Sequence, residues 1–121
     1  MTKQIKKLED GSIQFKNGRI EMPKNEVFKI DDDTVYFFLN KRKYLARMNT
    51  EDYLKNSLWA TLMTYDHLGP HGVVAYHNGW EHKSVAAVVM STSKGQKVGY
   101  ADTNRFNLCR ENLVVRGAAF A

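Results

Sequence analysis

The side chains best suited to metal chemistry lie in the stretch VGYADTNRFNLCRENLVVRG, at residues 98–117. Asp102, Asn104 and Asn107 follow one another there and offer oxygen ligands. Mg²⁺ accepts one or two carboxylates together with water molecules. Hydrolysis at such an ion also needs a base that deprotonates water. Tyr100 is a poor candidate, because a tyrosine phenol ordinarily titrates near about 10 and is hardly ionised at neutral pH. We therefore expect no catalytic residue and no bound metal ion in this stretch.

Histidines offer a second possible metal site. The chain has His67, His71, His77 and His82. Pro70 separates the first two and disrupts a regular helix face. A structural zinc site typically has two close ligand pairs that include cysteines, and Cys109, the single cysteine, lies far along the chain. We favour histidines in surface loops and hairpin edges, with a relocated nuclease site at His77 and His82 as the alternative.

Cys109 has two interpretations of its own. A small buried thiol is the ordinary role of a free cysteine. Arg110 beside it would lower the thiol pKa and favour a nucleophile, but the sequence positions no base. We favour the buried thiol.

Several strands are expected in the first half of the chain. SIQFKNGRIEM alternates apolar and polar residues around Asn17 and Gly18, which predicts a hairpin. We expect residues 1–10 to be frayed. EVFKI, TVYFFL and KYLARM are rich in β-branched and aromatic residues and predict further strands. The aspartates at 31–33 between them are typical of a solvated turn.

A change of period in NTEDYLKNSLWATLMTYD predicts a helix that is capped by Asn49 or Thr50, has Glu51 and Asp52 in its first turn and ends before the loop HLGPHG at residue 67. A hairpin around residues 78 and 79 should follow. Periodicity does not decide whether residues 85–90 form a strand or a short buried helix. We expect a strand at 97–102, a short helix at 105–113 and a last strand to 117.

Composition predicts one soluble domain. A chain of 121 residues buries enough surface to fold without disulfides, and a single cysteine allows no internal one. The first residues carry lysines without the apolar run of a signal peptide. No segment approaches the roughly 18 apolar residues of a membrane span. We expect a cytoplasmic protein that does not contact membranes.

Net charge points to polyanionic partners. The formal net charge is +5 and the pI about 9.4, which favours nucleic acid, although such a balance also serves solubility alone. The densest basic run is KRKYLAR at residues 41–47. The phosphate contacts that we predict are Lys41, Arg42, Lys43 and Arg47, with Lys83, Lys97 and Arg105 as weaker ones. The alternative is that this basic run is only a solvated turn.

Trp80 lies at the expected hairpin tip, with Tyr76 and Lys83 nearby. Exposed Trp80 and Tyr76 side chains would stack on bases or anchor a partner protein. The alternative is that Trp80 folds back over its own sheet.

The order and spacing of three segments resemble phage-type HNH homing endonucleases. VYFFLNKRKYLARMNTEDYLKNSLWA is similar to their opening region, with Asp52, Tyr53 and Trp59 at the matching places. GVVAYHNGWEHKSVAAVVM is similar to the following hairpin and helix, which is related to the AP2-type DNA-reading sheet. KGQKVGYADTNRFNLCRENLVVR is similar to the HNH block. The resemblance covers residues 35–116 and implies two strands and a helix around one divalent ion, with a histidine that deprotonates water.

The reaction centre that the resemblance implies is incomplete in this chain. Its Asp-His pair falls on Gly99 and Tyr100, and glycine has no ligand atom. The histidine of the preceding helix falls near Ala86, and the Asp-Asn pair falls near Asn107 and Leu108. What remains is the late Asn112-Leu113 pair, where we expect Asn112 to bond local backbone and Leu113 to enter the core.

We therefore expect an α+β fold of small β-sheets with a central helix, followed by a degenerate ββα unit of HNH type. Within one domain we distinguish an N-terminal β region at 1–34, an AP2-like sheet and helix at 35–97, and the degenerate HNH block at 98–117. The predicted function is non-catalytic DNA binding in a phage-type protein without a cofactor. The alternatives are a phage protein that inhibits or adapts a host or phage protein, and a residual metal-dependent nuclease.

Overall fold

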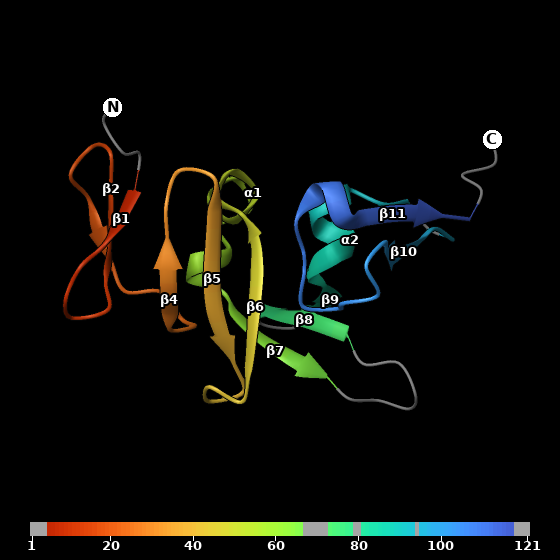
Figure 1. Ribbon diagram of the computed structural model, residues 1–121, viewed down its shortest axis with the longest axis horizontal. Coiled ribbons are helices and arrows are strands. Elements are labelled where there is room, and N and C mark those ends of the chain that lie inside the picture. Colours follow the sequence, from red (N-terminus) through yellow and green to blue (C-terminus); the bar gives the residue numbers. More distant parts are fainter. Residues whose placement is uncertain (1–4, 67–72, 79–80, 94, 118–121) are drawn as a thin grey trace.

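The computed structural model describes residues 5–66, 73–78, 81–93 and 95–117. Within these ranges the chain forms four small antiparallel sheets and two short α-helices, a mixed α+β fold (Figure 1). Three candidates from the sequence lie outside the described residues: Trp80, His67 and His71. Among the helices that are described, none has the length and apolar character needed to cross a membrane.

Sheet A consists of β1 (Ile5–Lys7), β2 (Ile13–Phe15) and β3 (Ile20–Glu21). The predicted Asn-Gly hairpin joins β2 to β3, with Gly18 at φ +90° and the Arg19 amide donating to Asn17 Oδ1 at 3.0 Å. The prediction that residues 1–10 are frayed is wrong for β1. Ile5 pairs with Phe15 and is buried, which holds the strand in place.

Sheet B consists of β4 (Val27–Ile30), β5 (Thr34–Leu39) and β6 (Tyr44–Asn49). The turn before β5 forms as predicted, because Asp31 Oδ1 accepts the amides of Asp33 and Thr34, each at 2.9 Å. Strand β4 precedes residue 35, so this sheet spans the boundary that the sequence suggested between the first two regions.

Helix α1 (Thr50–Lys55) is much shorter than predicted. Ser57 adopts a left-handed conformation at φ 53°, a short 3₁₀ turn η1 (Leu58–Ala60) follows, and the chain then enters β7 (Leu62–Asp66). The expectation that the helix continues to the loop at residue 67 is therefore wrong beyond Lys55. Leu62 and Met63 point to opposite faces of a strand, and they are 48% and 0% exposed.

Sheet C consists of β7, β8 (Val73–Asn78) and β9 (Glu81–Ser84). It leads directly into helix α2 (Val85–Met90), whose Ala87 amide donates to Ser84 Oγ at 3.4 Å. Residues 85–90 therefore form a short helix rather than a strand, with this cap at its start and one side buried.

The C-terminal block consists of β10 (Lys97–Tyr100), a 3₁₀ turn η2 (Arg110–Asn112) and β11 (Leu113–Arg116). The predicted helix over 105–113 is wrong, because side chains of the loop take up its backbone groups. The two strands pair antiparallel, and no α-helix follows them before the described part of the chain ends at Gly117.

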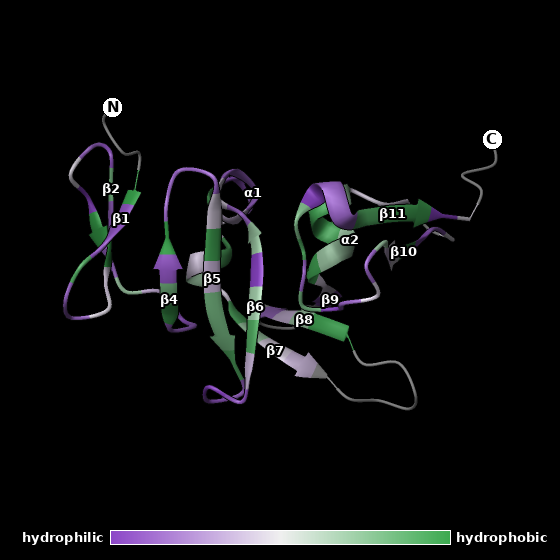
Figure 2. Cartoon of the chain, viewed as in Figure 1, coloured by the Kyte–Doolittle hydropathy of each residue, from purple (hydrophilic) through white to green (hydrophobic). Residues whose placement is uncertain are grey.

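Residues 106–108 attach this block to sheet B. The amide of Arg47 donates to the Phe106 carbonyl at 2.9 Å, and the amide of Leu108 donates to the Arg47 carbonyl at 2.8 Å. Leu108 thereby enters the same core as Phe37 and Met48. In Figure 2 the hydrophobic colour is clearest in β11, in parts of β5 and in α2, whereas the turns at both ends of sheet B are hydrophilic.

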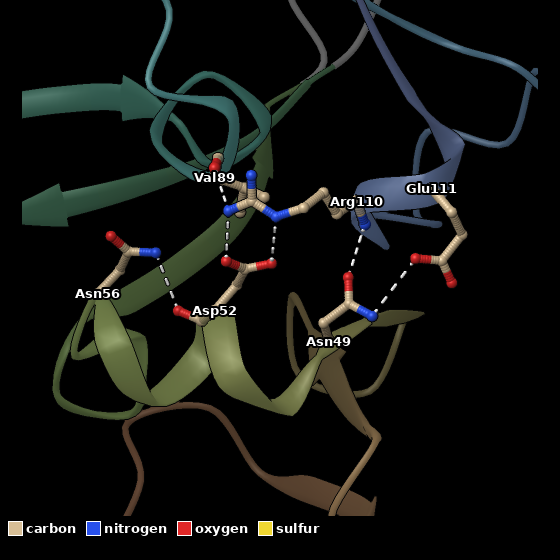
Figure 3. Close-up of polar contacts among 6 residues, drawn as sticks. All are labelled: Asn49, Asp52, Asn56, Val89, Arg110 and Glu111. Carbon is tan, nitrogen blue, oxygen red and sulfur yellow. Dashed lines mark hydrogen bonds and ion pairs between the residues drawn. The ribbon is translucent and has the colours of Figure 1, made fainter.

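A polar clamp joins α1, α2 and η2 (Figure 3). The Arg110 guanidinium donates to both oxygens of Asp52, at 2.7 and 3.3 Å, and to the Val89 carbonyl at 2.9 Å. Asn49 accepts from the Arg110 amide at 2.6 Å, so its side chain serves the clamp and makes no cap bond to α1. The clamp holds the C-terminal block against the first helix.

Candidate nucleic-acid interface

One face of sheet B packs on the core, and the opposite face is open. We call the open side the outer face, and it carries Phe28, Lys29, Tyr36, Phe38, Leu45 and Arg47. The alternation of β5 explains this arrangement, because Val35, Phe37 and Leu39 are fully buried and the residues between them point away from the core. Helix α1 lies behind the sheet in Figure 1, and the outer face looks toward the viewer.

Large apolar side chains remain accessible on this face. Phe28 is 55% exposed and Leu45 is 42% exposed. The Phe28 ring meets Phe38 edge-on, with ring centres 5.7 Å apart. Both Phe28 and Lys29 point outward because a bulge shifts the β4–β5 register between Val27 and Lys29. Exposed aromatic rings of this kind commonly mark a contact surface.

The basic turn between β5 and β6 projects from one end of the outer face. Asn40, Lys41 and Arg42 have φ values of 52°, 55° and 68°, and each such residue costs about 1–2 kcal/mol in backbone energy. The Asn40 side chain offsets part of this cost by donating to the Tyr65 carbonyl and accepting from the Tyr65 amide, both at 3.1 Å. The turn therefore presents Lys41, Arg42 and Lys43 to solvent on a fixed backbone.

Arg42 is engaged on two sides. Its guanidinium forms a two-pronged ion pair with Glu26, with Nε to Oε1 at 2.8 Å, and lies 5.5 Å over the Phe38 ring. The hydrogen bond from Arg42 lowers the pKa of Glu26 and keeps that carboxylate charged. Both side chains remain open to water, at 68% and 43% exposure, so the pair is weakly held and can exchange with another anion.

A cleft of about 370 Å³ opens beside the basic turn. This volume lies in the range of small-ligand sites. Its lining combines apolar groups, amides and cations from three segments: Lys24, Asn25, Glu26, Phe38, Asn40, Lys41, Arg42, Leu62, Met63 and Thr64. The Asn25 side chain holds the first segment in place by bonding Phe38 and Met63 backbone groups at 2.7 to 3.0 Å. Cations therefore border an apolar recess.

The structure gathers four of the seven predicted phosphate contacts. Lys41, Arg42 and Lys43 occupy the turn, and Arg47 lies on the outer face. The others are elsewhere. Lys83 pairs in register with the half-buried Tyr76 on sheet C, Lys97 begins β10, and the Arg105 guanidinium lies 5.9 Å over the Tyr100 ring.

Asp102 organises the loop between β10 and β11. Its Oδ1 accepts the Asn104 amide at 2.8 Å and Asn112 Nδ2 at 2.9 Å, and its Oδ2 accepts Asn107 Nδ2 at 2.9 Å. These hydrogen bonds, with that from Asn107 the largest, lower the pKa of Asp102. The oxygens that the sequence suggested as ion ligands thus hold the loop together.

The expected structural role of the Asn112-Leu113 pair is confirmed. Asn112 Nδ2 donates to the Asn107 carbonyl at 3.0 Å, Asn112 Oδ1 accepts the Asp102 amide at 3.0 Å, and Leu113 is buried. Gly99 lies under Arg116, whose Nε would be 3.3 Å from an added Cβ. Burial raises the pKa of Tyr100, so even less of its phenol is ionised and available as a base near neutral pH.

His77 faces Thr64, with Nε2 and Oγ1 2.8 Å apart. On the neighbouring strand β9, His82 is its partner in backbone register, and the side chain of His82 lies outside the described part of the structure. Within the described ranges, no three histidine, cysteine or acidic side chains are grouped to hold a metal ion.

Cys109 is a buried thiol. Burial, as the largest cause, raises its pKa. The Arg110 guanidinium, which the nucleophile interpretation places beside the thiol to lower its pKa, is bound to Asp52.

Sequence reasoning missed Phe28, Tyr36, Phe38 and Leu45. The three consecutive aromatics of TVYFFL contained the needed information, since a strand points alternate residues to opposite faces and leaves at least one ring outside. Nothing local indicated the bulge that turns Phe28 outward.

Comparisons with known proteins give no relative to compare at these positions. No family model matches the chain, and neither the curated proteins nor the solved structures contain a match.

Proposed function

We propose that the protein binds DNA without cleaving it, through the outer face of sheet B and the adjoining basic turn. The observation that carries this proposal is that the basic run at 41–47 adjoins a surface with the exposed Phe28 ring and the half-buried Tyr36 and Phe38 rings. Phe28, Lys29 and Arg47 lie on the outer face, and Lys41 and Lys43 lie on the adjoining turn, where the Lys43 ammonium is 5.6 Å from the centre of the Tyr44 ring.

Charge supports a phosphate ligand. Of the four cations just named, Arg47 lies near enough to Asp102 to lower the pKa of that carboxyl, and the neighbouring Glu26 is already paired with Arg42. Clustered Lys and Arg side chains give the electrostatic attraction that dominates binding to nucleic acid. Four such contacts predict a slope of log affinity against log salt of about −3 to −4.

The C-terminal block supports DNA binding without DNA cleavage. The positions where the resemblance to HNH endonucleases implies a catalytic pair are Gly99 and Tyr100. The first has no ligand atom, and the second is a half-buried phenol with a raised pKa. In this proposal the degenerate block is a scaffold whose loop 106–108 extends sheet B beside Arg47.

A paired set of variants tests the proposal. Lys41→Gln/Lys43→Gln removes two charges from the basic turn, and Lys16→Gln/Lys55→Gln removes two exposed charges from the side of the molecule where α1 lies. Fluorescence anisotropy with labelled DNA between about 50 and 200 mM salt should give a slope smaller by about 1.4–1.8 for the first variant only. Equal losses in both variants would mean that net charge, rather than this surface, attracts DNA.

The exposure of Phe28 and Leu45 also favours a second candidate, docking of a partner protein on the same face. This candidate is the inhibitor or adaptor that the sequence left open. A complex captured from host lysate that survives nuclease digestion and is lost in Leu45→Glu would support it.

A further inference from the structure

We infer that the DNA bound by this surface is single-stranded, with unstacked bases lying on the Phe28 and Tyr36 rings and the backbone on the surrounding cations. This inference rests on the proposed function and narrows it to one form of the ligand. Three features of the outer face carry it: the chemistry of the exposed rings, the register of the strands and the neighbouring cleft.

The exposed rings suit base faces rather than groove edges. Phe28 has no donor or acceptor, and in a duplex groove an apolar side chain contacts little besides the thymine methyl group. The faces of the bases are hidden inside a duplex and open in a single strand, where they stack on aromatic side chains without regard to sequence. Phe38 is less suited to stacking, since Phe28 meets one side of it and Arg42 covers another. Its role is to pack against the Phe28 ring and hold it in position.

Strand register places an aromatic residue between two cations. Tyr36 pairs with Lys29 on β4 and with Arg47 on β6, so the three residues form a row across the sheet. Neighbouring strands are separated by about 4.8 Å, which puts the two cations roughly 10 Å apart at their backbones. A base stacked over the centre of this row would have its phosphates within reach of long basic side chains on either side.

The cleft beside Phe38 continues this surface. It is bordered by Lys24, Lys41 and Arg42, and its recess contains Leu62 and Met63. A nucleotide that follows the stacked base can place its base in the recess and its phosphate on the turn. An unpaired strand can bend into such a cleft, whereas a duplex is too stiff to do so over one or two nucleotides.

Two probes and three variants test the inference. The probes are a fluorescein-labelled single strand of about 20 nucleotides and the duplex of the same sequence, which exceed the usual site size of a small domain. Phe28→Leu removes the ring but keeps an apolar side chain, and Phe28→Trp enlarges the ring. Ile20→Ala is the matched control, because Ile20 is 53% exposed on a different sheet. Circular dichroism melting checks that each variant is folded.

We expect the single strand to bind at least about tenfold more tightly than the duplex. Phe28→Leu should weaken single-strand binding by roughly 5- to 150-fold, the equivalent of one base stack, and change duplex binding by no more than about twofold. Phe28→Trp should retain single-strand binding, and Ile20→Ala should leave both affinities unchanged.

Two other results separate the inference from the proposed function. Equal or tighter duplex binding that is lost in Lys41→Gln/Lys43→Gln and indifferent to Phe28→Leu would overturn the inference and leave DNA binding intact. No salt-dependent binding of either probe would overturn both.

Discussion

Removing Arg110 tests whether the polar clamp holds the C-terminal block in place. Asp52 is only 4% exposed at its side chain, whereas Arg110 is 50% exposed. Arg110→Met would leave that carboxylate without two charge-assisted hydrogen bonds and the Val89 carbonyl without its donor. Breaking a fully buried pair costs about 3–5 kcal/mol. Because water reaches the arginine side of this pair, we expect a smaller loss of about 2 kcal/mol.

Urea unfolding followed by circular dichroism measures this loss. In a chain of 121 residues, a loss of about 2 kcal/mol corresponds to roughly 6–10 °C in melting temperature. Arg19→Met is the matched control, since Arg19 is 59% exposed and pairs with Glu21, which is 30% exposed. The control should lose less than about 1 kcal/mol.

A double-mutant cycle with Asp52→Asn isolates the pair from other effects of each substitution. Zero coupling between Asp52 and Arg110, or equal losses in Arg110→Met and Arg19→Met, would refute the reasoning. Water would then solvate the Asp52 carboxylate as well as the guanidinium does.

Two further predictions concern buried or bonded polar groups. The Tyr53 hydroxyl is buried without a hydrogen-bond partner among the described residues, and burial raises its pKa. Tyr53→Phe should therefore leave stability unchanged or raise it by up to about 1 kcal/mol in the same urea assay, and a clear loss would show that the hydroxyl is bonded. The pKa of Asp102 is lower in the folded chain than its ordinary value of 3.8. Its stabilising contribution is thus complete above the unfolded pKa and is lost as the pH falls through the folded pKa. Asp102→Asn should be less stable than the native chain near neutral pH, and the difference should shrink below about pH 4. A difference that stays constant down to about pH 2 would contradict this account.

Local patterns in the sequence predicted most strands and turns of this fold. The Asn17-Gly18 hairpin and the turn at Asp31 form as expected, because each depends on bonds within a few residues. The basic composition of residues 41–47 is likewise a property of the chain alone.

Tertiary pairing decided where the helices end. Met63 has the spacing of a helical core residue, yet it lies on β7, where the Asn25 side chain bonds its amide and carbonyl and the pairing of β7 with β8 places its side chain in the core. The helix expected at 105–113 does not form, since the Asn104, Asn107 and Asn49 side chains accept backbone amides of that loop and the edge of β6 bonds residues 106 and 108.

The candidate site likewise has one part that local sequence determines and one part that tertiary pairing determines. The sequence by itself determined that a run of cations follows three consecutive aromatic residues of a strand, because composition and the two-residue period of a strand are local. Only the tertiary structure decided that Phe28, Tyr36 and Arg47 share one open face. That arrangement depends on a bulge in β4 and on the register of three strands, and both are set by which side chains fill the core on the other side of the sheet.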